Sequence, residues 1–135
     1  MSTVWVLDAS AVLCYLLAEE GYQRAKAILR DAREHSPALL SAVNWSEVLH
    51  KLLRRVDPGA LQRTKEHVAL LPIQIVPLTA EGAESLARLR AKFRLSMGDA
   101  AVASLAEGRR GTIVTSDPDF RSVEGSIPVE WLRHR

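Results

Sequence analysis

The chain has 135 residues, the size of one ordinary domain, and 47% of them are apolar, which is enough for a hydrophobic core. Its formal net charge of +2 is compatible with a nucleic-acid partner but does not require one. No apolar run reaches membrane-spanning length, and we expect no signal peptide. Cys14 is the only cysteine, so no internal disulfide can form and a reducing cytoplasm is expected. The length predicts a single domain over residues 1–135, and we expect no membrane partner.

Short apolar runs alternate with segments that carry apolar residues at helical spacing. In chain order the predicted elements are strand 4–7, helix 9–17, a helix from 21, strand 38–40, helix 46–55, a helix from about 57 that ends at 72, strand 73–78, helices from 79 and 96, strand 112–115 and strand 128–132. This alternation predicts an α/β fold with a central, mostly parallel five-stranded sheet covered by helices on both faces. Pro128 makes the last strand a candidate for an edge.

Four acidic residues lie where apolar strands end or helices begin. They are Asp8, Glu47, Asp99 and Asp117. Right-handed crossovers place the carboxyl ends of parallel strands on one edge of the sheet, where α/β proteins bind ligands. We therefore expect these carboxylates, although distant in sequence, to share one pocket.

Each acid also has an ordinary explanation as part of a helix cap. Glu47 and Asp99 follow the candidate caps Asn44 and Ser96 at the spacing of a capping box. Asp117 precedes a proline, a pattern typical of an N-cap. Taken singly, each acid is explained at least as well by capping as by function.

Four carboxylates in one pocket need more than capping to explain them, because carboxylates close together repel one another. Two of them about 4 Å apart repel by roughly 4 kcal/mol at an effective dielectric near 20, and a helix N-terminus offsets only about 0.3–1 kcal/mol. Raised pKa values or a bound divalent cation would relieve the remainder. All-oxygen ligands favour Mg²⁺ or Mn²⁺, whereas the four histidines lack the spacing of a zinc site.

A cation of this kind suggests hydrolysis of a phosphodiester by an activated water, with no protein nucleophile. Ser10 and either Thr115 or Ser116 could orient the water or a carboxylate, and helix capping or a hydrogen bond at the strand end explains them as well. Basic residues could guide the phosphates of such a substrate to the pocket, although solvated helix faces explain them equally. They are Arg88, Arg90, Lys92, Arg94, Arg109 and Arg110.

Four short motifs carry a resemblance that covers nearly the whole chain. In order they are Asp8-Ala9-Ser10, Ser41 with Glu47 six residues later, Gly98-Asp99-Ala100, and the run Thr115-Ser116-Asp117-Pro118-Asp119-Phe120. Together they resemble the motifs of PIN-domain ribonucleases and, within that family, of VapC-type toxins from prokaryotic toxin–antitoxin pairs. Each motif is weak alone, and the four in this order are a strong signal.

The resemblance implies a sheet of order 3-2-1-4-5, Mg²⁺- or Mn²⁺-dependent endoribonuclease activity on RNA, a homodimer and a cognate antitoxin protein. It implies Asp8, Glu47, Asp99 and Asp117 as the catalytic acids. Of these, Asp8, Asp99 and Asp117 would hold the metal. Asp119 lies two residues after Asp117, so either or both could face the ion.

Other readings of the acids remain open at this point. A phosphoacceptor receiver domain would need paired acids after the first strand and a late lysine, but Ala9 and Ser10 follow Asp8 and no lysine follows Lys92. A haloacid-dehalogenase-like phosphatase would need an aspartate where Ser10 stands. The alternative of another class is a non-catalytic PIN-like module that binds RNA or protein, and the complete acidic set argues against it.

Overall fold

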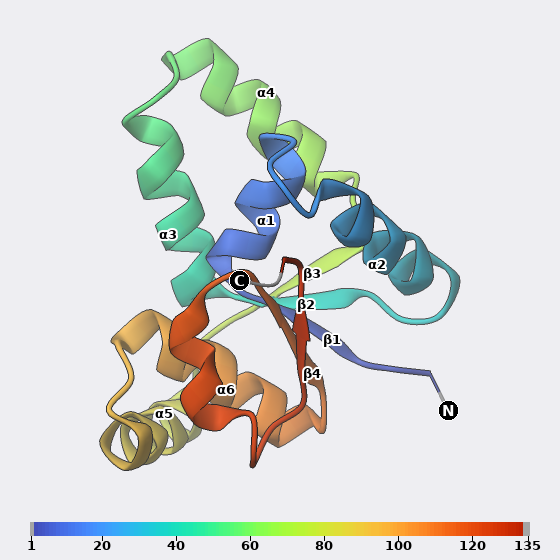
Figure 1. Cartoon of the computed structure of the whole chain (residues 1–135). Helices are drawn as coiled ribbons and strands as arrows, with labels where there is room; N and C mark the ends of the chain where they lie inside the picture. Colours follow the sequence, from blue (N-terminus) through green and yellow to red (C-terminus); the bar gives the residue numbers. More distant parts are fainter. Residues whose placement is uncertain (1, 134–135) are drawn as a thin grey trace.

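A computed structural model describes residues 2–133, and its centre is a five-stranded sheet (Figure 1). The strand order is β3-β2-β1-β4-β5, and all four pairings are parallel. The strands are β1 Trp5–Leu7, β2 Ala38–Ser41, β3 Ile73–Val76, β4 Thr112–Thr115 and β5 Val129–Trp131. The predicted α/β class, parallel sheet and strand order are therefore confirmed.

Helices cover both faces of the sheet, with α1 to α4 on one side and α5 and α6 on the other (Figure 1). They are α1 Ala9–Leu16, α2 Tyr22–Glu34, α3 Ala42–Leu53, α4 Pro58–Ala69, α5 Ala80–Phe93 and α6 Met97–Arg109, with a short 3-10 helix, η1, at Pro118–Val123. None of the described helices combines the length and the apolar character needed to cross a membrane.

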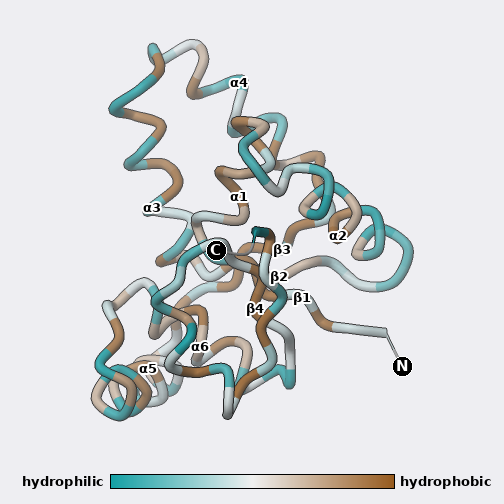
Figure 2. Tube along the Cα trace, in the orientation of Figure 1, coloured by the Kyte–Doolittle hydropathy of each residue, from teal (hydrophilic) through white to brown (hydrophobic). Residues whose placement is uncertain are grey.

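The central strand β1 divides the core because alternate side chains of a strand point to opposite faces. Trp5 and Leu7 pack with the buried residues of α1, α2 and α3, whereas Val6 packs with α5, α6 and Phe120 of η1. The apolar colour in Figure 2 accordingly follows the strands and the inner sides of the helices. The sheet and the helices packed on each of its faces therefore form three layers, as predicted.

Helix α3 begins four residues earlier than the sequence predicted. Ser41, the last residue of β2, is its N-cap and accepts a hydrogen bond from the amide of Val43 at 3.1 Å. Asn44 is therefore a residue inside the helix and not its cap. Glu47 lies in the second turn of the helix and not at its start, so its position needs an explanation other than capping.

The register of the central strands aligns the residues that follow them. Leu7 pairs with Leu40 of β2 and with Val114 of β4. The amide of Asp8 donates to the Val114 carbonyl at 3.2 Å, which extends this alignment by one residue. The carboxyl ends of β1, β2 and β4 thus form one edge, and the candidate site lies there.

Candidate functional site

Asp8 is buried at the end of β1, with only 4% of its surface exposed, and both of its carboxylate oxygens accept hydrogen bonds. Oδ1 accepts from the Ser10 hydroxyl at 2.7 Å and from the Ala11 amide at 2.8 Å, so Asp8 caps α1. Oδ2 accepts from the Thr115 hydroxyl at 2.5 Å. Partners from α1 and β4 therefore hold the carboxylate that the sequence places in an apolar environment.

The same hydroxyls also hold the loop after β4. The Ser10 hydroxyl accepts from the amide of Ser116 at 3.1 Å, and the Thr115 hydroxyl accepts from the amide of Asp117 at 2.9 Å. Ser10 and Thr115 thus connect the buried Asp8 to the segment that presents Asp117. Ser116 contributes its backbone amide to this network.

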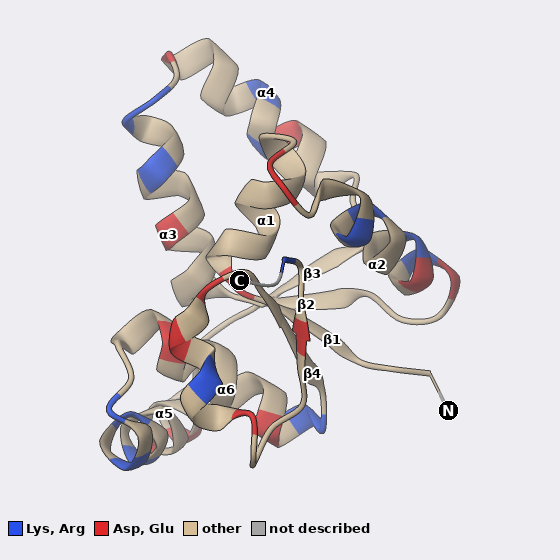
Figure 3. Ribbon diagram, viewed as in Figure 1, with Lys and Arg blue, Asp and Glu red and all other residues tan. Residues whose placement is uncertain are grey.

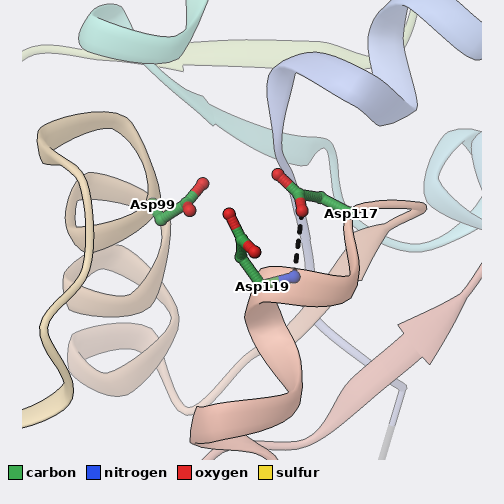
Figure 4. Close-up of side chains that lie close together, drawn as sticks. All are labelled: Asp99, Asp117 and Asp119. Atoms are coloured by element: carbon green, nitrogen blue, oxygen red, sulfur yellow. Dashed lines mark hydrogen bonds between the residues drawn. The ribbon is translucent and has the colours of Figure 1, made fainter.

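Three further aspartates converge at this edge (Figure 4). Asp99, Asp117 and Asp119 each offer a carboxylate oxygen, and these oxygens lie within 4.8 Å of one another. Asp99 lies in the first turn of α6, where its amide donates to the Ser96 hydroxyl at 3.2 Å. Asp117 caps η1 and accepts from the amide of Asp119 at 2.9 Å. The capping explanation therefore holds for Asp99 and Asp117, and it coexists with the clustering.

Burial and the repulsion between carboxylates raise the pKa of Asp8 and of Asp99. Burial is the main reason that the pKa of Asp8 rises to about 6, with a smaller contribution from the charge of Asp117. Burial also comes first for Asp99, whose pKa likewise rises to about 6, followed by the charges of Asp117, Asp8 and Asp119. Both carboxyls therefore take up a proton near pH 6, well above the pH at which an ordinary aspartate does so.

Asp8 is not one of the three aspartates in the close group, although the sequence predicts it as a metal ligand with Asp99 and Asp117. The third member of the close group is Asp119. The charge of Asp8 nevertheless acts on Asp99 and helps to raise its pKa. The sequence left open whether Asp117 or Asp119 faces the ion, and here both contribute an oxygen to the group.

Glu47 reaches the start of α6 from the side of α3. A side-chain carbon on Gly98 would lie 2.6 Å from both Glu47 carboxylate oxygens, so only a glycine allows this approach. The Asn44 side-chain amide donates to Glu47 Oε1 at 2.8 Å and to the Gly98 carbonyl at 3.0 Å. Glu47 is thereby held beside the backbone that carries Asp99.

Asn44 is the site residue that the sequence analysis misassigned. It is 1% exposed, and its amide nitrogen joins α3 to α6. The capping-box spacing Asn44-x-x-Glu47 suggested a cap because the helix was predicted to start too late. Ser41 could have indicated the correct start, because serine is a common N-cap residue. With a helix that starts at residue 42, Asn44 and Glu47 are three residues apart on one helical face.

The donor set fits a hard divalent cation. All candidate ligands are carboxylate oxygens, which Mg²⁺ and Mn²⁺ prefer. Ligands on opposite sides of a Mg²⁺ ion lie about 4 Å apart, and the three aspartate oxygens already lie within 4.8 Å of one another. A cation at Asp99, Asp117 and Asp119 would also offset the repulsion that raises the pKa of Asp99.

The family model for the PIN domain matches residues 5–126 of the chain. The chain belongs to the PIN domain family. No curated protein is a significant match by sequence. The matched residues include all four motifs and the first four strands of the sheet, β1 to β4.

Solved structures share the fold over nearly the full length. A toxin–antitoxin complex from Klebsiella pneumoniae contains a chain that is 21% identical, with a TM-score of 0.72 and coverage of 96% of this chain and 98% of the other. VapBC2 from Rickettsia felis bound to promoter DNA has 16% identity, a TM-score of 0.74 and coverage of 94% and 97%. VapC20 from Mycobacterium tuberculosis, a toxin that cleaves the sarcin–ricin loop, has 15% identity, a TM-score of 0.70 and coverage of 88% and 94%.

The raised pKa of Asp8 predicts a pH-dependent stability difference between the wild type and Asp8→Asn. The folded-state pKa of about 6 lies above the ordinary aspartate pKa of 3.8, so folding favours the protonated acid. The contribution of Asp8 to stability is complete below about pH 4 and is lost as the pH rises through about 6. We expect Asp8→Asn to gain on the order of 3 kcal/mol relative to the wild type between pH 4 and pH 7. Urea unfolding in EDTA measures this, and a difference that does not change with pH would contradict it.

The two hydrogen bonds of Asn44 predict a structural cost for Asn44→Ala. The variant removes the side-chain donor to the Gly98 carbonyl and to Glu47 Oε1, so we expect a loss of about 1–3 kcal/mol in the free energy of unfolding. Ser46→Ala, at an exposed position of the same helix, is the control and should change stability by less than about 0.5 kcal/mol. Urea unfolding of both variants measures this, and equal losses would show that Asn44 is not a link between α3 and α6.

Proposed function

We propose that the chain is a metal-dependent endoribonuclease that hydrolyses RNA phosphodiester bonds, and that it is the toxin of a toxin–antitoxin pair. The observation that carries this proposal is the group of Asp99, Asp117 and Asp119 beside the buried Asp8, at the carboxyl edge of a PIN-domain sheet. The structural relatives support it: two are toxin–antitoxin complexes, and a third is a toxin that cleaves an RNA loop.

The acids divide into roles according to their positions. Asp99 and Asp117 would hold a Mg²⁺ or Mn²⁺ ion, Asp119 offers a third oxygen, and Asp8 adds negative charge from the buried side. When bound, such an ion supplies an activated water and neutralises charge that develops on the phosphate. Glu47, held by Asn44, would orient the attacking water from the side of α3.

The polar side chains around the acids keep this arrangement in place. Ser10 and Thr115 fix Asp8 through its two oxygens and fix the following loop through its amides. Prior fixation matters because a nuclease site works only when the attacking group and the phosphate meet in line. We further propose a cognate antitoxin and a homodimer as partners of the chain.

Cleavage of RNA tests the proposal directly. We expect the purified protein to produce discrete 5′ ends in bacterial RNA with Mg²⁺ or Mn²⁺ and none with EDTA. Asp99→Asn should lower the cleavage rate at least about 100-fold, because removing a ligand costs at least as much as removing a residue that supports one. Glu107→Gln, at the far end of α6, is the matched control and should cleave normally. Cleavage that persists in EDTA, or in Asp99→Asn, would contradict the metal mechanism.

Metal binding can be measured without any RNA. A ligand that binds only the folded state at about 100 times its Kd stabilises it by about 2.7 kcal/mol. We expect Mn²⁺ to raise the melting temperature of the wild type and of Glu107→Gln, and to raise that of Asp99→Asn much less. Differential scanning calorimetry measures these melting temperatures. Equal increases in all three proteins would show that the ion binds elsewhere.

A further inference from the structure

Three cations gather at the far end of α3, around one hollow in the surface. Lys51 lies in the last turn of the helix, and Arg54 and Arg55 lie in the turn that follows it. All three residues are exposed. Within residues 2–133, the ion pairs of the structure involve other side chains, so these cations have no carboxylate partner there.

Helix capping explains only part of this cluster. A cation near the last carbonyls complements the helix dipole, and one of the three residues would be enough for that purpose. Three like charges around the same hollow repel one another. The arrangement is therefore one that an anion would stabilise.

The position of the cluster on α3 connects it to the proposed active site. Lys51 follows Glu47 by four residues, so these two lie on the same helical face, about 6 Å apart along the helix axis. Arg54 and Arg55 follow Leu53, the last helical residue, and continue the basic segment beyond Lys51. Figure 3 shows this order, with an acidic segment of α3 followed by basic segments toward its far end.

We propose that Lys51, Arg54 and Arg55 bind the phosphates of the RNA strand next to the bond that is cut. This inference rests on the proposed function and names the path of its substrate. A strand that leaves the aspartate group along α3 would bring successive phosphates to the three cations. Arginine suits this role because its planar guanidinium binds a phosphate through two parallel hydrogen bonds.

The basic residues singled out from the sequence are less well placed for this path. Arg88 of α5 pairs with Glu107 at 3.1 Å. Arg109 lies ten residues after Asp99 on α6, which separates them by about 15 Å along the helix. The cations at the end of α3 begin one helical turn from Glu47 and have no acidic partner among the described ion pairs.

The test compares two triple variants with the same loss of charge. K51Q/R54Q/R55Q removes the three proposed phosphate-binding cations, and we call it the track variant. K26Q/R30Q/R33Q removes one lysine and two arginines from the exposed face of α2, which leads to the opposite edge of the sheet. Both are purified as full chains, and circular dichroism and melting temperature verify that they fold. The probe is a fluorescein-labelled RNA hairpin with an unpaired loop of mixed sequence, bound in EDTA so that no cleavage occurs.

We expect the track variant to weaken binding and to reduce the slope of log K against log salt by about 2, since each phosphate contact of a single strand contributes about 0.7. The α2 variant should change the slope by less than about 0.5. In Mg²⁺, the track variant should raise KM at least about 10-fold and keep kcat within about 2-fold of the wild type. Equal losses in both variants, or an unchanged slope and KM in the track variant, would overturn the inference.

Failure of the track differs from failure of the proposed function. If the wild type cleaves RNA and the track variant keeps its KM, the site is a nuclease and the strand leaves it by another path. If the wild type neither binds nor cleaves RNA, the proposed function is wrong and the inference falls with it. A track variant that cleaves normally but changes its oligomeric state would show that the three cations contact protein, which also overturns the inference.

Discussion

The hydrogen bonds to Asp8 are the interaction on which the site depends. They join the end of β1 to α1 through Ser10 and Ala11, and to β4 through Thr115. A carboxylate that is 4% exposed would be costly to ionise without such partners. The same two hydroxyls also accept from the amides of the loop that carries Asp117. One buried acid thus positions an element more than a hundred residues away in sequence.

Carboxylate repulsion sets the balance between stability and function at this edge. Burial and neighbouring charges raise the pKa of both Asp8 and Asp99 to about 6, so ionising these carboxyls costs free energy that an ordinary aspartate does not lose. Sites of this kind are maintained for their chemistry and stabilised by the rest of the fold, here by two apolar layers on either side of the sheet. A divalent cation would convert the same repulsion into binding energy.

Helix α3 links the edge of the sheet to the outer surface. Ser41 caps its first turn, Asn44 and Glu47 in its first two turns contact the start of α6, and Lys51 in its last turn is exposed. Glu47 and Lys51 are four residues apart and so lie on one face. The helix therefore places a carboxylate beside the start of α6 and positive charge beyond it, which is the order that the proposed path of an RNA strand requires.

The sequence by itself determined the class of the fold and the edge at which the acids meet. Apolar runs and helical spacing are local patterns, and the motifs around Asp8, Asp99 and Asp117 supplied the family and with it the strand order. Only the tertiary structure decided that Asp119 joins the close group while Asp8 remains behind it, and that Asn44 holds Glu47 against Gly98. Those outcomes depend on side-chain directions and on contacts between distant segments, which periodicity does not encode.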